Sequence, residues 1–403
     1  MLNVIGWLLR PNLGRLATTK YESLKLTFEF EKRNLSIEAV HGKREINIHL
    51  NGTGHNLHPL NVKLRHDPTT LSDDDAIDGL VEDDSRLGPD KLEIPIWEAL
   101  KRIPNPIVIS LDRSISAEAD DLVYSEVVES QRRVVRNRPR SPLNRVKEVA
   151  AARYLSYRNR LGNLNENLKA KMVMSAFLHS PGSADPKKKV ARVSLSDITK
   201  LEQRISDYLS STIKDADIGT RIRGYFKDVK TMIRTTESRA EPDHKLFWGF
   251  FRNQYRQILA LAEAFDAFEK ESKDAFQEVS NYLDLVNKFL YDSGKEVVFD
   301  EGTNQLLFRY RPSGGAPSGF RALEHLSSGE RQILILFTFL AFVAQGEGIF
   351  IVDEPELSLH PKWQSEFLDA FLQIKPEKTE LLLATHSPDI VGKHKQACVV
   401  LLP

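Results

Sequence analysis

The pattern of apolar and polar positions divides the chain into two strand-rich parts with a long helical part between them. Residues 24–50 contain three short segments that alternate between apolar and polar side chains, as half-buried antiparallel strands do. Between about residues 129 and 294, apolar positions recur every three or four residues, which is the spacing of amphipathic helices. Residues 297–308 return to two apolar runs around a turn, which predicts a hairpin.

The last quarter of the chain carries two short, continuous apolar runs that each end in polar residues. Residues 348–352 lead directly into Asp353 and Glu354, and a second run, Leu-Leu-Leu-Ala, leads into Thr385-His386-Ser387. Continuous apolar runs are typical of strands covered on both faces, and open α/β sheets hold their ligands at the carboxyl ends of such strands. The two adjacent acids suit a metal-bound nucleotide, since one can hold Mg²⁺ while the other orients or deprotonates a water.

A second polar feature precedes the most apolar helical run of the chain. Residues 326–330, Leu-Ser-Ser-Gly-Glu, place small side chains just before the run from Ile333 to Leu340. The N-terminus of such a helix presents free N–H groups and the positive end of the helix dipole to an anion, most simply a phosphate.

These segments resemble, in the right order, the motifs of the ABC-type ATPase heads of the SMC-like, RecF-like and OLD-like families. Residues 326–330 resemble the signature motif and are called the signature segment below. Residues 349–354 resemble the Walker B strand, residues 356–361 the D-loop, and His386 the switch histidine. The resemblance is close over the last quarter of the chain and loose elsewhere.

The resemblance implies an α/β fold of the ABC/SMC-like P-loop NTPase head class, with a mixed sheet, an antiparallel β-subdomain and a helical insertion. It divides the chain into a first part of the head at 1–128, the insertion at 129–294, and the rest of the head at 295–403. Because the insertion is rich in aromatic residues and has no Cys-x-x-Cys hook, we expect a compact helical bundle rather than a long arm.

The resemblance also implies roles for single residues. In these families two heads sandwich two nucleotides, and the signature motif of one head faces the γ-phosphate held by the other. Asp353 would organise Mg²⁺, directly or through water, Glu354 would be the general base, and His386 would hold the γ-phosphate and the attacking water. ATP and Mg²⁺ are the implied cofactors, and a homodimer or higher oligomer through the heads is the implied assembly. The nucleotide-binding residues of the signature segment would be Ser327, Ser328, Gly329 and Glu330.

The phosphate loop of these families, GxxxxGK[ST], does not occur in the 403 residues. The apolar helix predicted at residues 2–9 stands where the helix after that loop would be. Two explanations stay open: the chain starts just past the loop, or it is a subunit that has lost the loop. We favour the first, because Met1 opens an apolar helix with no N-cap before it. We expect this chain alone to bind ATP weakly and to hydrolyse it negligibly, and the genomic sequence upstream of Met1 to separate the two explanations.

A basic stretch opens the predicted helical insertion. A DNA backbone could lie on such a face, whereas the alternative is a helix whose cations pair with acids elsewhere in the protein. The candidate DNA contacts are Arg132, Arg133, Arg136, Arg138 and Arg140.

Composition adds mainly exclusions. Lys and Arg together number 56, as do Asp and Glu, so net charge gives no argument for nucleic acid or a membrane. The only cysteine, Cys398, excludes an intrachain disulfide, and its apolar surroundings predict a small core residue. We expect a cytoplasmic protein, because neither a membrane-spanning run nor a signal peptide is apparent.

The functional hypothesis is an ATP-driven, dimerising head that couples nucleotide state to DNA or to an effector protein. It is similar to the compact ATPases of bacterial anti-phage systems, such as Septu-type or retron-associated ATPases, whose effector nuclease is a separate chain that we expect to be encoded nearby. The alternatives are a DNA-repair ATPase of the SMC-like group, or a non-hydrolysing interaction subunit that lends its signature segment to a complete partner.

Overall fold

The structure is a computed structural model. It describes residues 2–9, 16, 19, 21–42, 45–54, 56–63, 90–104, 106–109, 115–116, 141–176, 195–212, 217–237, 244–311, 319–344, 346 and 348–399. The chain forms two compact units, of which the first joins residues 1–155 to residues 278–403 and the second comprises residues 156–277. Within the described residues, no helix combines the length and the apolar character that crossing a membrane requires.

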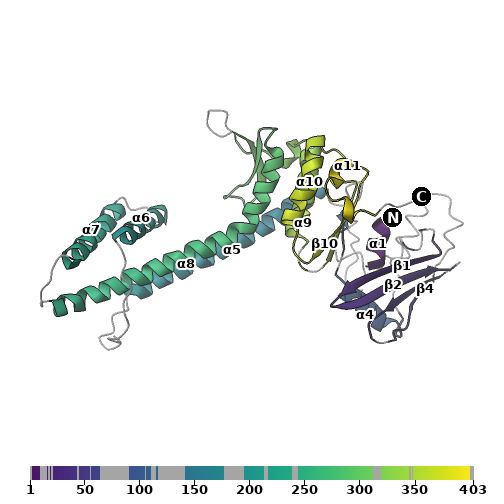
Figure 1. The fold of residues 1–403 in the computed structure, drawn as a ribbon, viewed down its shortest axis with the longest axis horizontal. Helices are drawn as coiled ribbons and strands as arrows, with labels where there is room; N and C mark the ends of the chain where they lie inside the picture. Colours follow the sequence, from purple (N-terminus) through teal and green to yellow (C-terminus); the bar gives the residue numbers. More distant parts are fainter. Residues whose placement is uncertain are drawn as a thin grey trace, which may run out of the picture. The chain divides into compact units, whose positions relative to one another are not determined.

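The first unit contains an antiparallel meander of four strands, visible in purple in Figure 1. Alternation puts the apolar side chains of the central strands on one face, where Ile37 lies opposite Leu50 and is fully buried. Two helices pack on the same core, α1 (Leu2–Leu9) and α4 (Ile94–Arg102). The strands are β1 (Ser23–Phe30), β2 (Arg33–His41), β3 (Glu45–Asn51) and β4 (Leu60–Lys63).

A second sheet of the first unit has the order β10-β9-β5-β6 and is mixed, since β5, β9 and β10 run parallel and β6 runs antiparallel to β5. Within the described residues β10 is an edge strand, and its side chains from Leu381 to Leu383 are only half-buried. The parallel register places Asp353 beside Ala384, so both strands end at one edge of the sheet. The strands are β5 (Ile107–Ile109), β6 (Ile115–Ser116), β9 (Gly348–Asp353) and β10 (Thr379–Ala384).

Two helices of the first unit belong to the core around this sheet. In α9 (Ser328–Phe342), every side chain from Ile333 to Phe342 is buried, as expected of a helix that is apolar all round. The ring of Phe371 on α10 (Pro361–Ile374) contacts both Phe337 of α9 and Phe350 of β9. Short elements complete this part: β7 (Lys295–Phe299), β8 (Leu306–Tyr310), η3 (Leu323–His325), α11 (Pro388–Val391) and η4 (Lys395–Ala397).

The helical part of the chain consists of α5 (Pro142–Ala176), α6 (Leu195–Thr212), α7 (Ile218–Glu237) and α8 (His244–Leu290). At 1.5 Å per residue, the 47 residues of α8 extend over about 70 Å. The expectation of a compact helical bundle rather than a long arm did not anticipate helices as long as α5, with 35 residues, and α8. In the second unit, α6 and α7 form a small core with Ile258 and Phe265 of α8. The predicted insertion at 129–294 encloses this unit, and its boundaries stay a prediction.

The structure confirms the α/β class, the antiparallel β-subdomain, the hairpin of β7 and β8, and the two strands that end in polar residues. The prediction that both strands are buried holds for β9 and is wrong for β10, whose side chains are mostly half-buried because it is an edge strand within the described residues. It contradicts the prediction that Cys398 is a core residue. Cys398 is exposed because it directly follows η4, and no described strand includes it or its neighbour Val399, which is also exposed.

Candidate functional site

The signature segment forms a closed N-terminal cap on α9. Ser327 is the N-cap residue, and its Oγ accepts a hydrogen bond from the backbone N–H of Glu330 at 3.3 Å. In return, Oε2 of Glu330 accepts the backbone N–H of Ser327 at 2.7 Å, which completes a capping box. Ser327 and Ser328 remain exposed, so their hydroxyl groups are accessible to a ligand.

The carboxylate of Glu330 is buried and paired with a lysine. Its side chain is 3% exposed, and the Nζ of Lys295 (14% exposed) lies 2.7 and 3.0 Å from its two oxygens. Burial alone would raise the pKa of Glu330, but the hydrogen bonds from Lys295 and from the Ser327 N–H hold this pKa below its ordinary value. These bonds fix the start of the helix, so Glu330 supports the cap from behind.

The glycine of the signature segment lies against the loop that resembles the D-loop. A Cβ atom at Gly329 would come within 2.4 Å of the carbonyl oxygen of Ser358, a distance that real Cβ atoms do not show. Ser358 itself has a φ of 69°, in the left-handed region. The loop therefore packs so closely against the signature segment that position 329 has room only for glycine.

The acidic end of β9 meets the end of β10. The backbone N–H of Glu354 donates to the carbonyl of Ala384 at 2.9 Å, and Glu354 has a φ of 48°. This conformation directs its carboxylate toward His386, whose Nε2 lies 3.2 Å from Oε1 of Glu354. The side chain of His386 is 93% exposed and that of Glu354 17% exposed. The structure thus brings Glu354 and His386 together, with Asp353 next to Glu354 in the chain.

Electrostatics make Glu354 more basic than an ordinary glutamate. Burial is the largest cause of its raised pKa, followed by the neighbouring carboxyl group of Glu356 and by Asp353, whereas His386 acts in the opposite direction. The Glu356 carboxylate behaves differently, because Thr385 and backbone N–H groups outweigh burial and lower its pKa. A carboxylate with a raised pKa is a better proton acceptor near neutral pH.

The chemistry of this edge fits a magnesium nucleotide. Among the described residues there is no group of three or more His, Cys, Asp or Glu side chains that could hold a metal ion. Mg²⁺ does not require such a group, since it is commonly bound by one or two carboxylates together with waters and substrate phosphates. Asp353, half-buried at the strand end, can supply one such carboxylate.

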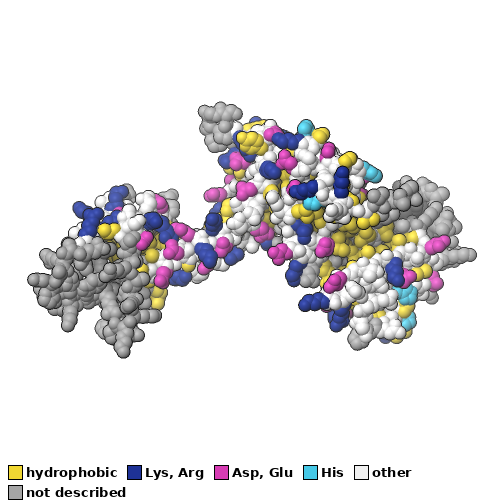
Figure 2. Space-filling model, viewed as in Figure 1, with side chains coloured by type: hydrophobic (Ala, Val, Ile, Leu, Met, Phe, Trp, Pro, Cys, Tyr) yellow, Lys and Arg dark blue, Asp and Glu magenta, His cyan; other side chains and the backbone are white. Residues whose placement is uncertain are grey.

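The five arginines predicted to contact DNA lie outside the described residues. On α5, which follows them, some of the described cations pair with acids, for example Arg153 with Glu278 and Lys169 with Glu166. Figure 2 shows Lys and Arg side chains interspersed with Asp and Glu along the described part of α5 and α8. This distribution matches the alternative of a helix whose cations pair with acids, and the DNA contact stays a prediction.

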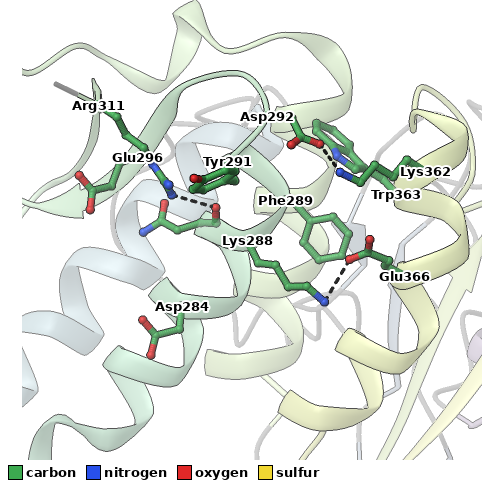
Figure 3. A pocket seen from close by; sticks show the side chains of 11 residues that line it. Asp284, Lys288, Phe289, Tyr291, Asp292, Glu296, Arg311, Lys362, Trp363 and Glu366 are labelled. Atoms are coloured by element: carbon green, nitrogen blue, oxygen red, sulfur yellow. Dashed lines mark hydrogen bonds and ion pairs between the residues drawn. The ribbon is translucent and has the colours of Figure 1, made fainter. Parts of the chain in front are cut away.

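A cavity of about 460 Å³ lies between the end of α8, the hairpin of β7 and β8, and the start of α10 (Figure 3). Two ion pairs lie on its wall, from Lys362 to Asp292 at 2.5 Å and from Lys288 to Glu366 at 3.0 Å. None of the predicted site residues lines the cavity, so it does not serve as the nucleotide site proposed below.

Two residues with contacts at the site were missed at the level of sequence. Glu356 lies two positions past Glu354 in the same acidic stretch. Its closeness to the predicted end of a strand could have marked it as a site residue. Lys295 opens β7, far from Glu330 in the chain, and nothing in the sequence connects the two residues.

Comparisons with known proteins match parts of this chain. Residues 197–392 match the family described as "AAA domain, putative AbiEii toxin, Type IV TA system". A curated relative, the Septu protein PtuA of Bacillus mycoides (strain KBAB4), is 24% identical over 155 residues, which cover 36% of this chain and 20% of the relative. The match thus spans about a fifth of the length of that protein.

Two solved structures of Smc heads are also similar. One is the Smc head domain with an extended coiled coil bound to the C-terminal domain of ScpA, from Pyrococcus furiosus. It has 12% identity and a TM-score of 0.30, with 92% of this chain and 72% of that chain covered. The other is the SmcHead bound to the C-winged helix domain of ScpA, with 14% identity, a TM-score of 0.23, and 31% and 39% covered. Both TM-scores are too low to indicate a shared arrangement.

The domain match covers the signature segment, the acidic strand end and His386, the same residues that the motif order singles out. Residues 197–392, just under half of the chain, thus match a family of AAA domains, and their motifs resemble those of the ABC-type ATPase heads of the SMC-like, RecF-like and OLD-like families.

Proposed function

We propose that this chain is an ATPase head that binds ATP and Mg²⁺ at a head-to-head dimer interface. In this proposal, closure and reopening of the dimer control DNA or an effector nuclease in anti-phage defence. The observation that carries the proposal is the contact between Glu354 and His386 at the ends of two adjacent parallel strands. Such a pair fits a site in which a carboxylate accepts a proton while an imidazole donates a hydrogen bond to charge that develops on a phosphate.

The residues take complementary parts in this proposal. ATP would supply the phosphoryl group, and Mg²⁺ would neutralise charge on its oxygens. Asp353 would hold the ion, directly or through water, while Glu354 would orient a water and accept its proton. From the opposite head, the exposed hydroxyls of Ser327 and Ser328 and the N–H groups of the helix start would face the triphosphate. Glu330 holds that helix start in shape.

The role in defence rests on the names of the matching proteins. The description of the matching family names a putative AbiEii toxin of a type IV TA system, and the matching relative is a Septu protein. Because the match covers a small part of that relative, the effector nuclease, the DNA contact through Arg132, Arg133, Arg136, Arg138 and Arg140, and the cytoplasmic location are all parts of the proposal.

The test measures the assembly state of the full gene product by light scattering, with and without saturating ATP and Mg²⁺. We expect ATP to convert monomers into dimers, and Glu354→Gln to trap the dimer while it lowers kcat by about 10²- to 10⁴-fold, the usual worth of a general base. Glu377→Gln is the matched control, because Glu377 is an exposed glutamate in the turn after α10. A product that stays monomeric under saturating ATP and Mg²⁺ would refute the sandwich.

A second candidate is a non-hydrolysing subunit that lends its signature segment to a complete partner head. The capping box and the ion pair of Lys295 with Glu330 favour it, because contacts within this chain alone build that surface. In a mixture with a complete head, Ser327→Ala would then abolish the stimulation of ATP turnover, and Glu354→Gln would leave it unchanged. If Glu354→Gln abolishes the turnover and Ser327→Ala leaves it unchanged, the first candidate is supported.

A further inference from the structure

Glu356 reaches from the loop after β9 to the end of the neighbouring strand β10. Its Oε1 accepts two backbone N–H groups, from His386 at 2.7 Å and from Ser387 at 3.0 Å. A carboxylate that accepts backbone N–H groups makes charge-assisted hydrogen bonds, which are stronger than those between neutral groups. This one side chain therefore links the acidic strand end to the residue that the proposed function uses as its second catalytic group.

The loop that carries Glu356 is itself well fixed. The N–H of Leu357 donates to the carbonyl of Glu354 at 3.2 Å, and the N–H of Leu359 donates to the carbonyl of Glu356 at 2.9 Å. Glu354 is in turn bonded to Ala384. Glu356 thus acts from a defined position on the same turn that orients Glu354.

His386 has little else to define its position. Its side chain is almost fully exposed, so packing does not hold the ring against Glu354. The next residue is anchored independently, because the Oγ of Ser387 donates to Gln364 at 2.7 Å and the N–H of Ser387 also reaches Oγ1 of Thr385 at 3.0 Å. The N–H of His386, by contrast, donates to Glu356 alone among the bonds of the described residues.

We propose that Glu356 is a positioning residue of the site, whose carboxylate holds the backbone of His386 so that the imidazole stays in contact with Glu354. This inference rests on the proposed function, since it assumes that the contact of His386 with Glu354 is used in catalysis. It predicts that Glu356 touches neither the nucleotide nor the metal, and that its hold on His386 matters more for turnover than its effect on the pKa of Glu354.

The structure also supplies a discriminating pair of variants. The second oxygen of Glu356, Oε2, is buried and accepts no hydrogen bond from the described residues. In Glu356→Gln, the amide oxygen can take the place of Oε1 and keep both N–H bonds, while the amide nitrogen takes the place of Oε2. In Glu356→Ala, both bonds are lost. A positioning role therefore predicts rescue by glutamine.

The first measurement follows amide hydrogen exchange of His386 in protein labelled with [¹⁵N]histidine. The chain has 11 histidines, and His386→Gln assigns the signal. We expect the His386 amide to exchange at least tenfold faster in Glu356→Ala, and within twofold of the wild type in Glu356→Gln and in the control Glu377→Ala. Equal exchange in the wild type and in Glu356→Ala would overturn the proposal.

The second measurement is steady-state ATP turnover of the full gene product. We expect Glu356→Ala to lower kcat at least tenfold with the KM for ATP unchanged within twofold, and Glu356→Gln to lower kcat less than threefold. Faster amide exchange without a fall in kcat would overturn the positioning role and leave the proposed function intact. If the wild type has no ATP turnover, the proposed function fails by itself, and the exchange data still decide whether Glu356 holds His386.

Discussion

The helix start at Ser327 and the strand end at Glu354 present two opposite ways to build a ligand-binding surface. At the helix start, the cap is closed on itself and supported from behind by the buried pair of Lys295 and Glu330. At the strand end, Glu354 has a left-handed backbone conformation and faces a histidine that is almost fully in solvent. The first surface is held by its own hydrogen bonds before anything binds, whereas the second combines local backbone strain at Glu354 with an exposed histidine.

This difference suits the helix start to binding of a ligand and the strand end to chemical reaction. A preformed helix start can offer hydrogen bonds to a phosphate without reorganisation, which suits a docking surface. Backbone strain at a polar residue is costly and persists where the surrounding structure enforces it, as is common at reacting groups. We expect substitutions behind the helix start to change stability, and substitutions at the strand end to change turnover.

The largest effect on stability is expected for Lys295→Met. This change leaves the carboxylate of Glu330 buried without its cation, and breaking a buried pair in this way costs about 3 kcal/mol of unfolding free energy. Urea unfolding followed by circular dichroism measures the loss. The double variant Lys295→Met with Glu330→Gln removes the unpaired charge and should recover most of the stability. A single variant that loses less than about 1 kcal/mol would show that the pair does not support the cap.

A smaller loss is expected for Gly329→Ala. The new Cβ would meet the Ser358 carbonyl at 2.4 Å, and relieving such an overlap in a packed region costs about 2 kcal/mol. The same urea titration measures it. The matched control is Gly224→Ala on α7, where a Cβ would meet nothing within 4 Å and the helix should gain up to about 1 kcal/mol. Equal effects at the two glycines would contradict the close contact.

The contribution of Glu330 should depend on pH. Its pKa is lowered in the folded protein, so the stability that it contributes is fully present above the ordinary glutamate pKa of 4.5. That stability is lost as the pH falls below this value through the folded pKa. Urea unfolding of the wild type and of Glu330→Gln, at pH 7 and in steps below pH 4.5, measures this contribution. The difference in unfolding free energy between the two proteins should shrink as the pH falls. A constant difference over this range would contradict the assignment.

The smallest effect is expected for an exposed ion pair. Lys288 and Glu366 lie 3.0 Å apart on the cavity wall with side chains 59% and 38% exposed, so water screens their attraction. Lys288→Ala should change the unfolding free energy by less than about 0.5 kcal/mol. A loss as large as that of Lys295→Met would remove the contrast between buried and exposed pairs that underlies these predictions.

Much of this architecture could be read from the sequence, because local patterns determine it. The alternation in residues 24–50 and the continuous runs before Asp353 and Thr385 predicted strands that the structure confirms. Their polar ends had to meet, since parallel strands end at one edge.

The rest depended on contacts between distant residues. The pairing of Lys295 with Glu330 joins positions that share no local pattern, and the hydrogen bonds of Glu356 depend on how two strand ends are aligned. The 47-residue length of α8 was missed because helical periodicity shows which face is buried and leaves open which element covers it. Cys398 was misplaced because an apolar run is buried only when a neighbouring strand or helix receives it.

The open side of β10 has a practical consequence for handling the protein. Within the described residues no strand pairs with that side of β10, although the N–H and C=O groups of Thr379 are bonded to Pro376 and Lys375, and its leucines are only half-buried. An apolar edge of this kind is a template onto which another polypeptide can add a strand. Preparations of the chain should therefore show concentration-dependent self-association that nucleotide does not influence, and only association that follows the ATP concentration can be credited to the heads.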